Sequence, residues 1–375
     1  MSLESRVKLE IDLKKLAGNF NEIRRRVFPC RVMAILKANA YGLGGQPIAK
    51  VLKHAGAAAF GVAEINEALE LTSLGLPVQI LGNLLPNEIA AAVEHGIVCP
   101  LNNLEMAQKI NAEAVKQHKI VTCAVTIDSG MGRLGMPAAE AASSILAMRE
   151  LPNLKLSGIY SHFSCAFMRY DDYSLNQLAS FKALLNELSL NGLVFEDIHM
   201  AASDALNNFP DSTRAPFNLA RCGINMYGFY DNDVQQSMRL NPVVELKTRL
   251  AAVRKLKAGS YIGYGRMHRL LKDTLVGTIA AGYADGLPLA LSNRGYVLVN
   301  GEFCPVLGRV SMDYTTISLE NAPGAQMGDE VICIGGQNGR AITLEEWAQL
   351  KSTHVYELLC SFGTRVRRVY INDSF

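Results

Sequence analysis

Lys37 is the residue of this 375-residue chain whose position most clearly suggests chemistry. It directly follows the apolar segment 32–36, and the glycine-rich segment 42–45 comes soon after it. A lysine in such a place is either a solvated strand end or a desolvated amine with a lowered pKa, which suits Schiff-base chemistry. The glycines favour the second interpretation, because they let the backbone approach a ligand closely.

Other chemically capable side chains also follow short apolar segments. They are Arg133 at the end of the loop 128–133, His162 after 154–161, Ser203 at the start of a helical pattern, and Arg221 with Gly223 in 218–226. A serine at a helix start is either a plain cap or part of an anion site, because helix N-termini attract negative charge. These side chains can form one active site only if the fold brings the ends of these segments together.

Short apolar segments alternate with helical patterns over the first part of the chain. The segments are 31–36, 58–62, 77–81, 97–100, 120–127, 154–161, 196–200 and 218–226. The helical patterns include 45–54, 64–74, 87–95, 104–117, 138–149, 174–191 and 203–208. Strands that are apolar on both faces are typical of parallel sheets. Eight strand–helix units in roughly 225 residues predict an α/β fold, a (β/α)8 TIM-type barrel whose active residues lie at the carboxyl ends of its strands.

A doubly wound sheet is the competing fold, but it would be expected to carry Gly-x-Gly-x-x-Gly after its first strand. The segment 37–45 does not match that pattern.

The alternation of strand and helix patterns ends at about residue 235. A polar, turn-rich stretch at 229–241 marks the change, and we interpret it as a linker. We predict a barrel domain at 1–235 and a mainly β domain at 236–375. The β-rich runs are 243–253, 274–282, 296–299, 303–310, 313–319, 330–334 and 365–371. Asn-Gly pairs at 300–301 and 338–339 predict tight turns, and Thr343 with Glu346 predicts a capped helix. Residues 6–13 alternate with period two and could add a strand to the β domain.

The composition excludes several classes of function. Thirty-seven basic and 35 acidic residues give a net charge of +2, so no electrostatic argument favours nucleic acid or an anionic membrane surface. No run reaches the ~18 apolar residues that cross a bilayer, and the N-terminus shows no signal-peptide pattern. The eight cysteines are scattered without Cys-x-x-Cys, which favours reduced thiols in a cytoplasmic protein over a metal site or disulfides.

The segment 34–42 resembles the signature of the alanine racemases, fold-type III enzymes that use pyridoxal 5′-phosphate (PLP). Further matches follow in order at 128–135, 161–163, 221–228, 264–265, 282–286 and 308–313. The resemblance runs from about residue 6 to residue 371. It implies a barrel followed by a β domain, and interconversion of L-alanine and D-alanine to supply D-alanine for peptidoglycan.

The resemblance also implies roles for individual residues. Lys37 would bind PLP covalently and act as one proton-transfer base, and Arg221 would face the pyridine nitrogen. A guanidinium keeps its proton at ordinary pH, so that nitrogen would stay unprotonated. Arg133 would bond the cofactor phenolate oxygen and the substrate carboxylate. The residues implied as phosphate ligands are Tyr41, Ser203, Gly223 and Ile224.

Racemisation needs a base on each face of the reacting carbon. The resemblance implies that Tyr264 of the partner subunit is the second base, in a head-to-tail homodimer with shared active sites. Free tyrosine has a pKa of about 10, so we expect a cationic His162, backed by Arg221, beside it. The small-molecule substrate would also meet Met312, Asp313 and Tyr283, with Tyr283 at the entrance.

This chain departs from the family pattern at several positions. Thr126 stands where many relatives carry a carbamylated lysine, and we hypothesise a bound chloride beside Thr126 and Arg133. Ala202 replaces an asparagine next to Ser203. Leu289 replaces an entrance arginine, and the acids nearest after His162 are only Asp171 and Asp172. We therefore expect a more hydrophobic vestibule.

Near the C-terminus, Thr364 aligns with a tyrosine of many relatives, and Arg367 with a proline. A smaller residue at 364 could admit serine, unless a loop shift makes the alignment wrong. A broader serine/alanine racemase is therefore one alternative function. A PLP-dependent amino-acid decarboxylase, a non-catalytic PLP carrier and a cofactor-free sugar-phosphate isomerase are the others.

Overall fold

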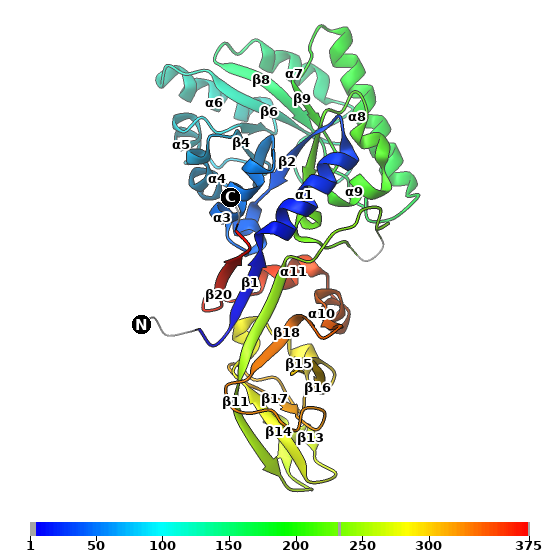
Figure 1. Cartoon of the computed structure of the whole chain (residues 1–375). Coiled ribbons are helices and arrows are strands. Elements are labelled where there is room, and N and C mark those ends of the chain that lie inside the picture. Colours follow the sequence, from blue (N-terminus) through cyan, green and yellow to red (C-terminus); the bar gives the residue numbers. More distant parts are fainter. Residues whose placement is uncertain (1–4, 232–233, 374–375) are drawn as a thin grey trace. The chain divides into compact units, whose positions relative to one another are not determined.

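The computed structural model describes residues 5–231 and 234–373. The chain divides into two units, which we call the barrel unit and the β unit (Figure 1). The barrel unit is Lys15–Asn241, and the β unit joins the N-terminal residues up to Lys14 to those from Pro242 onward. Of the predicted linker, residues 232 and 233 lie outside the described residues. The structure thus divides at 241/242, where the sequence suggested 235/236.

Eight parallel strands in the described part of the barrel unit form the barrel. They are β2 (Arg31–Ile35), β3 (Ala59–Val62), β4 (Val78–Ile80), β5 (Cys99–Leu101), β6 (Val121–Asp128), β8 (Leu154–Tyr160), β9 (Asp197–His199) and β10 (Leu219–Cys222). The two-residue strand β7 (Met136–Pro137) pairs with one of them, β6, beside it. The eight strands pair in the orders β10-β2-β3-β4 and β5-β6-β8-β9. A parallel bridge from Gln79 to Val98 joins β4 to β5. Backbone hydrogen bonds Asn218 N to Ile198 O and Arg221 N to Ala201 O join β10 to β9, which completes the predicted barrel.

Helices alternate with these strands. The main ones are α1 (Leu13–Val27), α3 (Gly45–His54), α4 (Ile65–Leu71), α5 (Ile89–Glu94), α6 (Leu104–Lys116), α7 (Ala141–Arg149), α8 (Asp172–Leu190) and α9 (Ser203–Asn208). Helix α1 precedes β2, and the other helices lie in the segments between later strands. Strands β3, β4, β5 and β10 are buried along their whole length, as expected of strands covered on both faces. The apolar residues between the strands and this helical layer form the core of the unit.

One predicted strand was too long. The segment 218–226 was expected to be extended throughout, but β10 ends at Cys222 and a 3-10 turn, η3 (Ile224–Tyr227), follows. Gly223 makes the change of direction with φ −119° and ψ −97°. The apolar run continues because η3 is itself buried, so hydrophobicity alone could not show where the strand ends.

The β unit is built around a nine-stranded sheet. Strand β1 (Lys8–Asp12) pairs antiparallel with β11 (Val244–Leu256) and parallel with β20 (Arg367–Ile371). The other strands of the unit are β14 (Thr274–Ile279), β15 (Tyr296–Val299), β16 (Glu302–Pro305), β17 (Thr315–Ser318), β18 (Glu330–Gln337) and β19 (Arg340–Ile342), with a separate hairpin of β12 (Tyr261–Ile262) and β13 (His268–Arg269). The predicted mainly β architecture is confirmed.

The tight turns and the capped helix predicted for the β unit are confirmed. Both residues of the pairs at 300–301 and 338–339 have positive φ, and each pair joins two antiparallel strands. Helix α10 (Leu344–Lys351) begins with the predicted capping box, in which Thr343 Oγ1 accepts from Glu346 N at 3.2 Å. A further short helix, α11 (Val355–Cys360), follows it.

Across the described ranges, none of the helices combines the length and apolar character needed to cross a membrane. All eight cysteines are free, and six of them are buried.

Candidate active site

Lys37 begins a left-handed helical turn, α2 (Lys37–Tyr41), directly after β2. Residues 38–41 have φ between 52° and 57°. Left-handed helix costs roughly 1–2 kcal/mol per L-residue, and none of these four is glycine. Other interactions must therefore hold the turn that carries both Lys37 and Tyr41.

Glu67 on α4 supplies those interactions. Its Oε1 accepts hydrogen bonds from the N–H groups of Ala38 and Asn39, and its Oε2 accepts from Ala63 N at 2.9 Å. At the other end of the turn, Asn39 Oδ1 accepts from Gly45 N at 2.6 Å. The sequence showed Glu67 only as one of several acids in a helical pattern, so its role was missed.

Arg221 occupies the buried centre of the barrel unit with 4% of its surface exposed. Its Nη2 lies 2.8 Å from Ser161 O and 2.9 Å from Met200 O, and its two hydrogens are shared among these carbonyls and His162. Nη1 lies 2.7 Å from His199 Nδ1, and Nη2 lies 2.9 Å from His162 Nδ1. A guanidinium carries only donors, so both Nδ1 atoms must accept. Both histidines are therefore neutral and carry their proton on Nε2.

The electrostatics of this group agree with its geometry. Burial lowers the pKa of His162 well below its usual value, and the charges of Arg221, Arg133 and Lys37 lower it further. Burial and Arg221 lower the pKa of His199 in the same way. Burial lowers the pKa of Arg221 only to about 10, so Arg221 remains the cation. The expectation of a cationic His162 was wrong: it presents a neutral Nε2–H donor.

Arg133 stands at the end of a loop shaped by Asp128. One Asp128 oxygen, Oδ1, accepts from the N–H groups of Gly130 and Met131, both at 2.8 Å. The hydroxyl of Tyr173 on α8 donates to Gly130 O at 2.6 Å. Arg133 itself is exposed and forms neither a hydrogen bond nor an ion pair with any residue that the structure describes. It is thus placed to bind an anion.

Helix α8 also holds the segment after His162. The buried Gln177 accepts from Ser164 N at 3.0 Å and donates to His162 O at 3.3 Å. Asp171, one of the acids nearest after His162, caps this helix by accepting from Ser174 N at 2.9 Å. The first turns of one helix therefore position both Arg133 and His162.

Thr126 is buried on β6 beneath this loop. Its hydroxyl donates to the hydroxyl of Tyr160 at 2.9 Å, and the Tyr160 ring stacks on His199 with centroids 5.0 Å apart. The Nε2 of Gln79, also buried, has no partner. The surroundings of Thr126 are thus polar, and the bound chloride stays a hypothesis.

The four residues expected at the phosphate lie together. Ser203 Oγ accepts from Gly223 N at 3.0 Å, and Ile224 follows Gly223 at the start of η3. A Cβ atom on Gly223 would lie 2.3 Å from the Tyr41 hydroxyl oxygen, so only glycine leaves room for that hydroxyl. Ala202 offers no side-chain cap to α9. Hydroxyls and helix N-terminal N–H groups that share one such cradle fit a phosphate dianion.

The remaining predicted residues belong to the β unit. Tyr264 opens the 3-10 turn η4 (Tyr264–Arg266) and is 71% exposed. Met312, Tyr283 and Leu289 are also exposed. Asp313 is bonded to Arg365 at 2.7 Å.

The comparison with known proteins identifies the family. The models of the alanine racemase N-terminal and C-terminal domains match residues 11–231 and 243–370. The chain belongs to the alanine racemase family. An alanine racemase of Desulforamulus reducens is 37% identical over 368 residues, covering 96% of this chain and 98% of its own length.

Solved alanine racemases share the whole fold. The enzyme of Clostridium difficile 630 superposes with a TM-score of 0.93 at 30% identity, covering 99% of this chain and 97% of its own. The alanine racemase of Bartonella henselae, solved with covalently bound pyridoxal phosphate, has a TM-score of 0.87 at 28% identity, with 98% and 100% covered. The resemblance seen in the sequence motifs is confirmed.

Replacing Glu67 with glutamine should loosen the left-handed turn. The amide turns a donor toward N–H groups that need an acceptor, and hydrogen bonds to a charged group contribute about 1.5–3 kcal/mol. We expect E67Q to bind PLP at least tenfold more weakly, measured by titration of visible absorbance. The exposed Glu70 of the same helix provides the control E70Q, and equal PLP affinity in both variants would contradict the role of Glu67.

Acid should destabilise the fold through the two neutral histidines. Their pKa values are lowered on folding, so below about pH 6.5 the unfolded chain binds protons that the native state does not. The free energy of unfolding should fall with decreasing pH by up to about 1.4 kcal/mol per pH unit for each histidine. Urea unfolding between pH 7 and pH 5 measures this slope. H199Q should flatten it, whereas H54Q, which changes a surface histidine, should not.

Proposed function

We propose that this protein interconverts L-alanine and D-alanine, with PLP bound to Lys37 and a second base from the partner subunit. The observation that carries the proposal is the buried Arg221, which donates to the neutral His162 and His199. The charge of Lys37 also lowers the pKa of His162, so the lysine lies near enough to this group to act on it.

The barrel unit offers what PLP requires. Lys37 supplies the amine, and the cradle of Tyr41, Ser203, Gly223 and Ile224 suits the phosphate. When bound, PLP withdraws electrons from the Cα of an attached amino acid and makes its C–H acidic. Arg221 would face the pyridine nitrogen, and because a guanidinium keeps its proton, that nitrogen would stay unprotonated. The electron withdrawal is then weaker than with an acidic partner, so catalysis depends more on well-placed bases.

Two bases act on opposite faces of Cα in this proposal. The amine of Lys37 moves the proton on one face, and the hydroxyl of Tyr264 of the partner subunit moves it on the other. His162 donates its Nε2–H to that phenol oxygen and so stabilises its anionic form. Because His162 is neutral, the positive charge that favours the anion comes from Arg221 behind it.

A homodimer is supported by the distribution of the residues. Each chain holds Lys37 in the barrel unit and Tyr264 in the β unit, which would supply the base to its partner. The β unit also exposes many large apolar side chains, as interfaces between subunits do before assembly. They include Tyr261, Tyr264, Met267, Leu271, Tyr283, Leu289, Met312 and Tyr314. A two-fold head-to-tail dimer would cover them, and the free cysteines suit a cytoplasmic location.

The function is tested by two substitutions on purified protein. K37A should lose the visible absorbance of lysine-bound PLP and all racemisation. Y264F should keep the absorbance, because Tyr264 lies outside the barrel unit. Its kcat for D-alanine formation should fall by about 10²–10⁴-fold. Racemisation at the wild-type rate in both variants would overturn the two-base assignment.

In this proposal, Thr364 affects how strongly the enzyme prefers alanine over serine. Thr364 is exposed and leaves space where many relatives place a tyrosine, which favours some activity on serine. We expect T364Y to raise the ratio of kcat/KM for L-alanine over L-serine at least fivefold. T353Y, which adds the same bulk outside the candidate site, is the control. An unchanged ratio in T364Y would favour a strict alanine racemase.

A further inference from the structure

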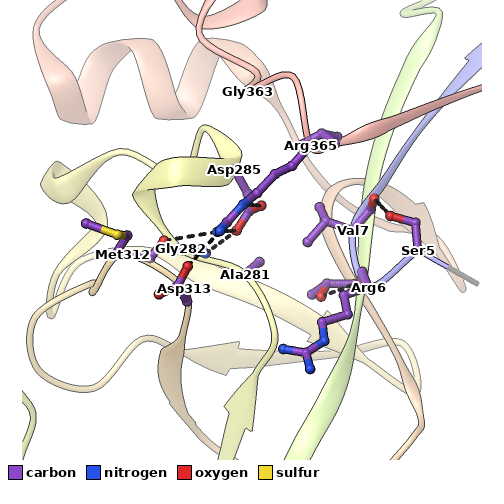
Figure 2. Close-up of polar contacts among 12 residues, drawn as sticks. Ser5, Arg6, Val7, Ala281, Gly282, Asp285, Met312, Asp313, Gly363 and Arg365 are labelled. Atoms are coloured by element: carbon purple, nitrogen blue, oxygen red, sulfur yellow. Dashed lines mark hydrogen bonds and ion pairs between the residues drawn. The ribbon is translucent and has the colours of Figure 1, made fainter.

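Three segments of the β unit meet at one guanidinium (Figure 2). Arg365 donates from Nε to Asp285 Oδ1 at 2.7 Å and from Nη2 to Asp285 Oδ2 at 2.9 Å. It also donates from Nη1 to Asp313 Oδ1 at 2.7 Å. We call Arg365, Asp285 and Asp313 the Arg365 clamp. It joins chain segments that lie 80 and 52 residues apart in sequence.

The backbones around the clamp are packed without spare room. A Cβ atom on Gly282 would lie 2.2 Å from Ser311 O, and one on Gly363 would lie 2.3 Å from Ala284 O. Asp285 Oδ2 also accepts from Gly282 N at 2.9 Å. The three segments therefore touch through main chain, and a shift of one must move the others.

The contacts fix the peptide planes on both sides of Met312. Ser311 O accepts from Tyr283 N at 3.0 Å, and Met312 O accepts from Ala284 N at 3.1 Å. Arg365 Nη2 adds a longer bond to Met312 O at 3.4 Å. In a trans peptide the C=O and N–H groups point in opposite directions. Holding Ser311 O therefore sets the direction of the Met312 N–H.

That N–H group is open. Within the described part of the chain, nothing accepts a hydrogen bond from Met312 N. A donor held in direction but left without an acceptor suits a carboxylate oxygen. Tyr283 in η5 (Tyr283–Asp285) is fixed by the same contacts.

The two ion pairs of the clamp contribute unequally to its stability. Asp285 is 1% exposed, so loss of Arg365 leaves a buried carboxylate without its cation. The two-point contact with Arg365 needs the planar fork of a guanidinium, which lysine does not have. Asp313 is 47% exposed, so its bond to Arg365 contributes less.

We propose that the Arg365 clamp positions the Met312 N–H for binding the substrate carboxylate and holds Tyr283 at the entrance, so that Arg365 and Asp285 are positioning residues of the racemase. This inference rests on the proposed function. Neither residue touches the substrate in this proposal, and neither takes part in proton transfer. Their loss should therefore weaken substrate binding more than it slows the chemical step.

Steady-state kinetics of the PLP-loaded enzyme test the proposal. We expect R365K to raise KM for L-alanine about tenfold or more while kcat changes less than threefold. D285N should behave similarly, and D313N should have a smaller effect. Partial unfolding would instead lower kcat, because it reduces the active fraction without changing KM. The control is R340K, which alters an exposed ion pair with Glu302 on the same unit and should match wild type.

Hydrogen exchange of the holoenzyme gives a readout independent of activity. Amides in a peptide spanning 309–314 should exchange faster in R365K than in R340K, with equal visible absorbance of bound PLP. Wild-type KM and wild-type exchange in R365K would overturn the proposal. If R365K does not fold, D285N, which changes a residue that does not meet the substrate, decides by the same two measurements. A wild-type enzyme inactive on L-alanine would refute the proposed function, and the exchange data would still decide whether the clamp holds Met312.

Discussion

The barrel unit is organised around a buried cation that has no carboxylate partner among the described residues. Arg221 is compensated by carbonyl oxygens and by the Nδ1 atoms of His162 and His199. A buried charge is expensive unless its hydrogen bonds are satisfied, so these acceptors are a condition for the fold. They also decide the chemistry, since the same bonds fix the tautomers of both histidines. Stability and protonation state thus follow from one set of contacts.

In the turn after β2 a negatively charged group has the stabilising role. Its hydrogen bonds offset the conformational strain of the backbone. Residues 38–41 adopt a backbone that L-residues avoid, and the carboxylate of Glu67 binds the N–H groups that this backbone presents. Strain maintained in this way fixes the direction of side chains. The same carboxylate therefore stabilises the turn that has Lys37 at one end and Tyr41 at the other.

The sequence predicted the elements better than the interactions between them. The barrel strands were located because burial on both faces leaves continuous apolar runs, and the Asn-Gly turns because their conformation requires those residues. The end of β10 was missed, since the buried η3 continues the same hydrophobic run. The charge of His162 was predicted wrongly, because it depends on which nitrogen faces Arg221. Glu67 and Arg365 were missed because their partners lie far away in sequence.

The pairing of β1 with β20 has a consequence for biosynthesis. The strand made first, Lys8–Asp12, forms a parallel ladder with Arg367–Ile371, which the ribosome makes last. The barrel unit is continuous and is complete once residue 241 has been synthesised. At roughly 5–20 residues per second, the N-terminal strand then waits on the order of ten seconds for its partner. During that interval a folded barrel carries an unpaired strand edge, which is the kind of surface that chaperones protect and that neighbouring nascent chains can capture.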